Sequence, residues 1–92
     1  MPVSQKTVTV GTSATALFNA SHNRRRFVVH NGSGATVYVG GPGVTTSNGI
    51  TVVDGAKFEI MQSFQTDASA KYQWYAVAAA PDKVLRVVEV TG

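Results

Sequence analysis

Short runs in which β-branched or aromatic residues alternate with polar ones recur along the whole chain. Residues 6–10, KTVTV, alternate valine with threonine, and in residues 35–39, ATVYV, two valines lie on the face opposite Tyr38. A period of two places every second side chain on the same side of an extended strand. Turn-forming residues separate the runs, so the pattern predicts about eight strands, over residues 6–10, 14–18, 25–31, 35–39, 49–53, 57–61, 71–79 and 83–90.

Glycine, asparagine and aspartate separate these runs in combinations typical of tight turns. Asn31-Gly32 and Asp54-Gly55 are dipeptides that tolerate the positive φ angles which short hairpin turns require. No long stretch shows an apolar period of 3.6 residues with helix caps. We therefore expect an all-β fold, a single antiparallel β-sandwich or small barrel of about eight strands, with hairpin or jelly-roll-like connections.

The length of the chain favours one domain. With 92 residues and no linker-like segment, residues 1–92 are expected to form a single β domain. Residues 1–5 are small and polar, and we expect them to be a flexible N-terminal arm. There is no cysteine, so neither a disulfide nor a thiolate metal site stabilises the fold.

The chain carries few charges. Charged residues make up 14% of the sequence, with a formal net charge of +3, whereas soluble domains average about 25%. This poverty favours a surface partly covered by other protein. The basic excess is too small to predict nucleic-acid binding. No apolar run approaches the roughly 20 residues that span a bilayer, and the N-terminus lacks the apolar core of a signal peptide, so we expect synthesis in the cytoplasm and no membrane partner.

Residues 40–49 contain the densest group of glycines. A phosphate-binding P-loop requires a lysine and a following helix, but no lysine lies here and the strand-like ITVV follows. We interpret the segment as a connector between strands, in which Pro42 fixes a sharp bend. Its remaining function would be contact with a neighbouring protein through the residues Pro42, Val44, Thr45, Thr46 and Asn48.

Arg24, Arg25 and Arg26 form the one run of charges. Aromatic residues do not interleave them, which argues against a nucleic-acid surface. In a strand, Arg25 and Arg26 point to opposite faces, so the run does not make a single patch. We expect these arginines to form ion pairs at the surface or with another protein, a role for which arginine is favoured.

Candidate catalytic and metal-binding groups are sparse. His22 lies in a polar turn and His30 at the end of a strand, while the five acidic residues are scattered singly. Metal sites require several converging ligands, and no nucleophile-elbow motif is present. The sequence therefore predicts a protein that is not an enzyme and that binds neither a metal nor a cofactor.

Tyr72, Trp74 and Tyr75 form an aromatic cluster. Such rings can stack on sugars, but they also supply much of the buried area of a small core. We expect Trp74 in the core and Tyr75 partly exposed or in contact with a partner. A glycan-binding platform is the alternative interpretation.

The stretch NRRRFVVHNGSGATVYVGGPGVTTSNGITVVDGAKFEI, followed by YAVAAAPDKVLRVVEV, resembles small virion structural proteins of tailed bacteriophages. Those proteins share an arginine-led strand, an Asn-Gly turn, a TVYVGG strand and a VTTSNGI loop, and end in a strand like RVVEV. The resemblance covers roughly residues 5–91 and contains no catalytic motif. It implies a capsid decoration protein, a small head or tail component, or a module attached to a fibre, and we expect this chain to be a free-standing small protein.

Our first hypothesis is a noncatalytic virion protein, a capsid decoration (cement) protein that stabilises the capsid lattice. Its partners would be the major capsid protein or other virion proteins, and we expect a homo-oligomer. It would be located in the virion after synthesis in the host cytoplasm, and would dock through its sheet edges, its N-terminal arm and residues 40–49. The alternatives are a carbohydrate- or receptor-binding module on a fibre or capsid surface, and a small tail or connector component.

Overall fold

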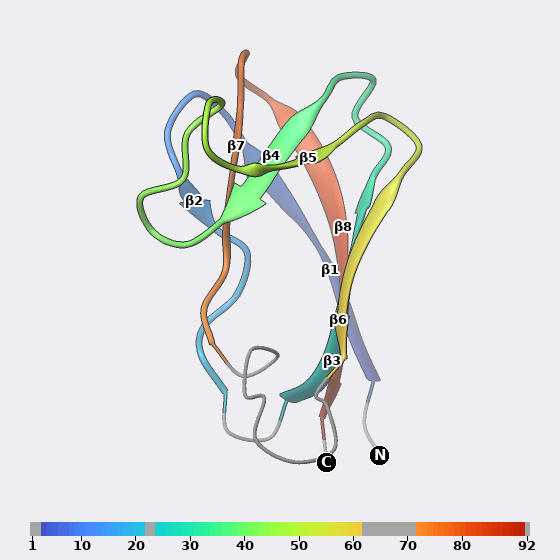
Figure 1. The fold of residues 1–92 in the computed structure, drawn as a ribbon. Helices are drawn as coiled ribbons and strands as arrows, with labels where there is room; N and C mark the ends of the chain where they lie inside the picture. The colour runs from blue at the N-terminus through green and yellow to red at the C-terminus, as the bar shows by residue number, and fades with distance from the viewer. Residues whose placement is uncertain (1–2, 22–23, 62–71, 92) are drawn as a thin grey trace.

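The chain forms an all-β fold, as the alternating pattern predicts (Figure 1). The structure, a computed structural model, describes residues 3–21, 24–61 and 72–91. Each of the eight predicted runs overlaps one strand. The strands are β1 (Val3–Val10), β2 (Thr15–Ala16), β3 (Arg24–Asn31), β4 (Val37–Gly40), β5 (Ile50–Val52), β6 (Lys57–Met61), β7 (Tyr75–Ala78) and β8 (Lys83–Thr91).

The strands build two four-stranded antiparallel sheets that pack as a sandwich. Sheet A has the order β1-β8-β3-β6 and sheet B the order β2-β7-β4-β5. The first strand pairs with the last, β2 with β7, β3 with β6, and β4 with β5. This is the result of rolling one long antiparallel hairpin into two layers, and it is the jelly-roll connectivity.

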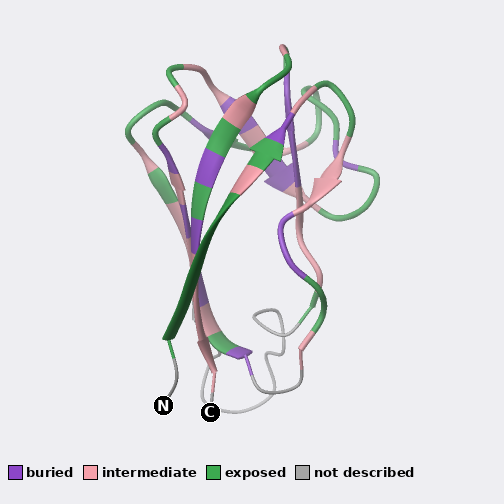
Figure 2. Cartoon of the chain, turned by 180° about the vertical axis from the view of Figure 1, so that it is seen from behind, coloured by how far each residue is buried: buried purple, intermediate pink, exposed green. Residues whose placement is uncertain are grey.

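The hydrophobic core lies between the two sheets. Alternate residues of β3, β4 and the first half of β8 point inward and are buried, as the purple segments of Figure 2 show. Phe27 is at the centre of an aromatic group, with ring centroids 4.8 Å from Phe18, 5.7 Å from Trp74 and 6.0 Å from Phe58. The buried members of the core are Val10, Leu17, Phe18, Phe27, Val29, Val37, Val39, Val52, Ala76, Ala78, Leu85 and Val87.

Asn31 closes the core at one end of the sandwich. It is buried, and its side-chain amide donates hydrogen bonds to the carbonyls of Ala35 (2.7 Å) and Val52 (2.8 Å). Its Oδ1 accepts hydrogen bonds from the backbone and hydroxyl of Ser33. Gly55, with a φ of 86°, confirms the expected Asp-Gly turn and donates its N–H to the Asn31 carbonyl. The side chain of Asn31 thus links the turn that follows β3 to the turn that follows β5.

Two expectations about segment ends are wrong. The flexible arm expected over residues 1–5 does not include residues 3–5, because Val3, Ser4 and Gln5 pair in register with Val90, Glu89 and Val88. Residues 1–2 lie outside the described residues. The strand expected over residues 71–79 is shorter, since β7 begins at Tyr75.

Candidate interaction surfaces

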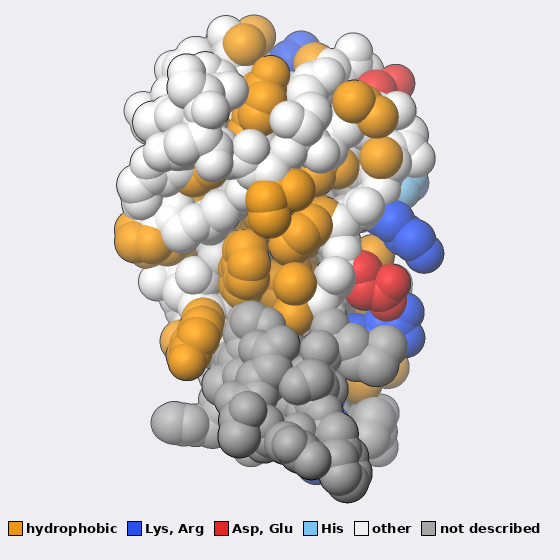
Figure 3. Space-filling model, viewed as in Figure 1, with side chains coloured by type: hydrophobic (Ala, Val, Ile, Leu, Met, Phe, Trp, Pro, Cys, Tyr) orange, Lys and Arg blue, Asp and Glu red, His pale blue; other side chains and the backbone are white. Residues whose placement is uncertain are grey.

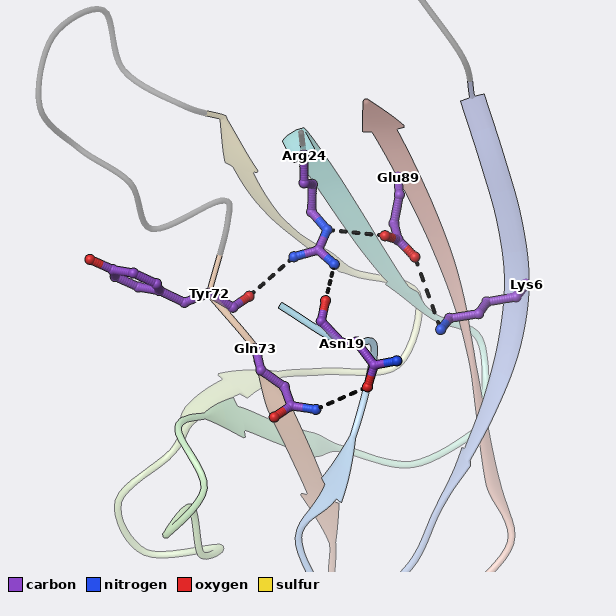
Figure 4. Close-up of polar contacts among 6 residues, drawn as sticks. All are labelled: Lys6, Asn19, Arg24, Tyr72, Gln73 and Glu89. Carbon is purple, nitrogen blue, oxygen red and sulfur yellow. Dashed lines mark hydrogen bonds and ion pairs between the residues drawn. The ribbon is translucent and has the colours of Figure 1, made fainter. Parts of the chain in front are cut away.

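Arg24 is the buried member of the arginine run, and its guanidinium group forms several hydrogen bonds. It is 1% exposed, and its Nε donates to Glu89 Oε2 at 3.0 Å. Its Nη1 donates to the carbonyl of Tyr72 at 3.1 Å, and its Nη2 donates to the carbonyl of Asn19. The guanidinium carbon lies 3.8 Å from the centroid of the Phe18 ring. Figure 4 shows that these partners come from both layers, so Arg24 joins strands of sheet A to the segments beside β2 and β7.

The placement of Arg24 corrects the expectation that it forms a surface or intersubunit ion pair. Arg24 pairs with Thr91, but Arg26 pairs with the adjacent Val90, so the register shifts between them. A bulge of this kind reverses which face a side chain takes. Without the shift Arg24 would share the outward face of Arg26; with it, Arg24 points into the sandwich.

The other two arginines lie apart from Arg24. Arg25 is exposed, and Arg26 is on the outer face of sheet A with 43% of its side chain accessible. Arg26 forms an ion pair with Glu59 of the neighbouring strand β6. The three arginines do not make one patch, and partner contact by Arg25 or Arg26 stays a prediction.

Residues 41–49 form an ordered loop between β4 and β5. The Val44 N–H donates to the Gly41 carbonyl at 3.0 Å, which closes a turn through Pro42 as expected. Asn48 Oδ1 accepts the Thr45 N–H at 2.7 Å, and the Gly49 N–H donates to the Thr45 carbonyl at 3.1 Å. The loop thus pairs several of its own backbone groups, so the connector interpretation fits its geometry.

The loop packs onto its own strand through Val44. Val44 is 7% exposed, so little of its side chain is accessible to a partner, and the partner contact expected of it stays a prediction. A Cβ on Gly49 would lie 2.7 Å from both Tyr38 Cβ and Val44 Cγ2, so only glycine fits there. The other candidate contact residues of the loop are exposed and uncharged, consistent with the uncharged upper left of Figure 3. These are Pro42, Thr45, Thr46 and Asn48, and partner contact through them stays a prediction.

The three aromatic residues after the undescribed segment 62–71 do not form one platform. Trp74 packs against the core, with its ring 5.7 Å from Phe27 and 5.4 Å from Phe58, as expected. Tyr72 is 62% exposed. Tyr75 is half-buried, and its hydroxyl donates to Gln73 Oε1 at 3.0 Å. A flat stacking surface made by all three rings is therefore not present.

The outer face of sheet A carries a row of basic side chains that no single stretch of sequence contains. Leu85, Val87 and Val29 are buried, so Arg86 and His30, which alternate with them, point outward. Arg86 pairs with His30, and His30 pairs with Lys57. Directly opposed side chains have Cβ atoms about 4.5–5.5 Å apart. Three strands thus place Arg86, His30 and Lys57 side by side, with Glu59 as the one described carboxylate on this face.

Five valines lie beside this basic row. Val88 pairs with Val28, and Val90 pairs with Val3, all on the outer face. Val3 is 64% exposed and Val84 is 44% exposed, while the remaining three are half-buried. An antiparallel sheet with one solvated face normally presents polar residues outward. Exposed apolar patches framed by polar groups mark sites of protein interaction.

A shallow hollow lies where the basic row meets the valines. Its volume is about 310 Å³, and it lies between β1 and β8, lined by Gln5, Lys6, Thr7, Arg86, Val87 and Val88. Figure 3 shows basic, acidic and histidine side chains gathered along the side of the molecule next to β6, the opposite edge of the same sheet.

Sequence reasoning did not find this face as a candidate site. The signal available was the segment VLRVVEV, in which the outward positions of β8 hold valine more often than a polar residue. The basic row itself depends on the pairing of β3 with β6 and β8. This pairing places His30 beside Lys57 and Arg86, residues that lie at least 27 positions away from it in the sequence.

Among the residues that the structure describes, no group of three or more histidine, cysteine or acidic side chains lies close enough to hold a metal ion. His22 lies outside the described residues. In the same parts of the chain, no helix has the length and apolar character needed to cross a membrane.

No protein-family model matches the chain, and no curated protein matches it at a significant level. Among solved structures, it is similar to the stem and receptor-binding domain of the spike protein P1 from bacteriophage PM2. The TM-score is 0.64 at 15% identity, over 89% of this chain and 31% of that chain. This chain therefore spans less than a third of the spike structure. Bacillus endospore appendages, described as disulfide-linked pili, match with a TM-score of 0.45 at 14% identity, over 97% of this chain and 88% of that chain. The likeness to the spike structure shows that the two share a fold.

Proposed function

We propose that the protein is a noncatalytic structural component of a virion, and specifically a capsid decoration protein. The observation that carries this proposal is the outer face of sheet A, where the valines and the row Arg86, His30 and Lys57 form one continuous surface. A mixed basic and apolar face fits a protein surface that presents carboxylates among apolar side chains. The resemblance of the sequence to small phage virion proteins, and the fold shared with a phage spike domain, support a virion as the setting.

The mechanism would be burial of surface across the boundaries between shell subunits. The outward valines leave water on docking, which favours association by about 25 cal/mol for each Å² of apolar surface buried. The basic row selects an acidic partner and speeds encounter, since opposite charges steer association. Because many equivalent sites exist on a shell, weak individual contacts add through avidity. Separating shell subunits would then also expose the docked surface.

The proposal is tested by counting the protein in particles purified by density gradient. Quantitative mass spectrometry should find it in a fixed, high ratio to the major shell protein. A few copies per particle would rule out decoration and favour the small tail or connector role.

Surface variants then test the docking face. Particles lacking the protein are incubated with purified Arg86→Glu or Lys57→Glu protein, and with Thr51→Glu protein as a control for an added charge on the exposed part of sheet B. We expect the first two to lose at least tenfold in affinity and the control to bind like wild type. Equal binding by all three would place the docking surface elsewhere.

A receptor-binding module on a fibre or capsid surface is the second candidate. It is favoured by the fold shared with the stem and receptor-binding domain of a phage spike, and by the exposed ring of Tyr72. A glycan array probed with wild-type and Tyr72→Ala protein separates the candidates. Glycan binding that Tyr72→Ala abolishes would support recognition, and no binding to any glycan would leave this candidate without support.

A further inference from the structure

The four edge strands of the sandwich are not equally protected against pairing with another chain. An edge strand presents unpaired N–H and C=O groups, and natural proteins shield such edges with short strands, charges, prolines or bulges. In sheet B the edges are short, since β2 has two residues and β5 has three. In sheet A the edge strand β6 carries Lys57 and Glu59 toward solvent.

The remaining edge strand, β1, has only one of these protections, the single inward-pointing charge of Lys6. It is eight residues long, and its eight pairs with β8 run in continuous register without a bulge. Figure 2 shows it as an almost unbroken exposed strand along the side of the sandwich. It contains no proline, and its outward side chains are the uncharged Val3, Gln5, Thr7 and Thr9.

The single charge of β1 points away from the outer face. Lys6 is opposite the buried Val87, so it lies on the inner side of the sheet, and its Nζ is 4.0 Å from Glu89 Oε1. Among the described residues, the backbone of Val3–Val10 forms ladder hydrogen bonds with β8 alone. Within the described part of the chain, the free edge of β1 is therefore unpaired, and its one charge, that of Lys6, lies on the inner side beside Glu89.

We propose that β1 pairs antiparallel with β1 of a second copy of this chain, about a two-fold axis that passes through Thr7. A two-fold axis perpendicular to the sheet keeps the outer faces on one side, so outward residues must meet outward residues. An axis through Lys6 would oppose two lysines, and directly opposed like charges are destabilising. An axis through Thr7 opposes Thr7 to Thr7, Gln5 to Thr9 and Lys6 to Val8 of the two copies.

This Thr7 register is the longest one in which no two like charges lie directly opposite each other. It pairs residues 4–10 of each copy, whereas an axis through Gln5 or Val8 pairs a shorter stretch of the strand. The outward side of the edge is uncharged and so fits a copy of itself, and two-fold symmetry closes the assembly after two chains. The two sheets A then form one continuous eight-stranded sheet, with both basic and apolar outer faces on the same side.

The pairing does not depend on the proposed function, although it would double the docking surface and so add avidity. Sedimentation velocity measures it on the full purified chain, over a range of concentrations. We expect a reversible dimer for wild type, and for Thr51→Lys, which adds the same charge to an edge strand of the other sheet. Thr7→Lys should raise the dissociation constant at least tenfold. A wild type that stays monomeric up to near-millimolar concentration, or a Thr7→Lys dimer as tight as wild type, would overturn the proposal.

Cysteine cross-linking tests the register and does not require the lysine variant to fold. The chain has no cysteine of its own. Under mild oxidation, Thr7→Cys should give a disulfide-linked dimer, because opposed Cβ atoms are close to disulfide distance. Gln5→Cys faces Thr9 of the partner and should remain monomeric on a denaturing gel. Equal cross-linking of both variants, or none of Thr7→Cys, contradicts the Thr7 register. Particle binding with a monomeric wild type would leave the proposed function standing and remove this inference alone.

Discussion

Truncating Arg24 should destabilise the fold more than any other change in the arginine run. Arg24→Ala removes a buried guanidinium and leaves the Tyr72 and Asn19 carbonyls and the Glu89 carboxylate without their donor. Breaking a buried ion pair by removing one partner costs about 3–5 kcal/mol. Glu89 keeps 17% of its side chain exposed and has Lys6 nearby, so we take the lower end, about 3 kcal/mol.

This cost is large against the whole stability of the domain. At about 0.05–0.15 kcal/mol per residue, a domain of this size is stable by roughly 5–14 kcal/mol. Urea unfolding followed by the fluorescence of Trp74, the single tryptophan, measures the change. With an m-value of about 1–3 kcal/mol/M, the midpoint should fall by roughly 1–3 M. Arg24→Lys keeps the charge but not the planar fork, so we expect an intermediate loss of about 1–2 kcal/mol.

Two controls separate the loss of the Arg24–Glu89 ion pair from other effects of the substitution on stability. Arg26→Ala breaks a partly exposed pair on the same strand and should cost no more than about 1 kcal/mol. In a double-mutant cycle with Glu89→Gln, the Arg24 and Glu89 changes should show a coupling of about 1–3 kcal/mol. The reasoning is refuted if Arg24→Ala costs less than about 1 kcal/mol, or if the two changes are additive.

Two further changes test the turns and the loop. Asn31→Asp replaces a buried amide donor by an acceptor that faces the Ala35 and Val52 carbonyls. In urea titration, it should lower the free energy of unfolding by about 2–4 kcal/mol. A loss below about 0.5 kcal/mol would contradict the role given to these hydrogen bonds. Gly49→Ala should cost about 1–3 kcal/mol because its Cβ would overlap Tyr38 and Val44. Gly43→Ala, which has open space around it, should stay within about 0.5 kcal/mol of wild type, and equal losses for the two glycines would show that the close approach is not what matters.

The strands were predictable because they follow a period of two that local sequence reveals. Phe27 and Val29 lie inward, and Val37 and Val39 lie opposite Tyr38, as the alternation requires. Which strands pair was left open, because a jelly roll joins the two ends of the chain. Val3 lies opposite Val90, and no local pattern carries that information.

The missed placements within the strands share one physical cause, which is that strand register decides the face on which a side chain lies. A bulge invisible in the sequence turns Arg24 inward, and the pairing of three strands assembles Arg86, His30 and Lys57. The burial of Val44 had a weak signal in the sequence, because Val44 is the one apolar residue between Gly40 and Gly49 apart from Pro42. Gly40 and Gly49, which lack a Cβ, leave room for its side chain against β4.

The claim that the outer face of sheet A attaches the protein to a virion shell is tested most directly by cryo-electron microscopy of the particle. Difference density between particles with and without the protein should lie over boundaries between shell subunits. Fitted into it, the molecule should turn β8, β3 and the row Arg86, His30 and Lys57 toward the shell. Density confined to a tail or spike, or a fit with that face toward solvent, would contradict the account.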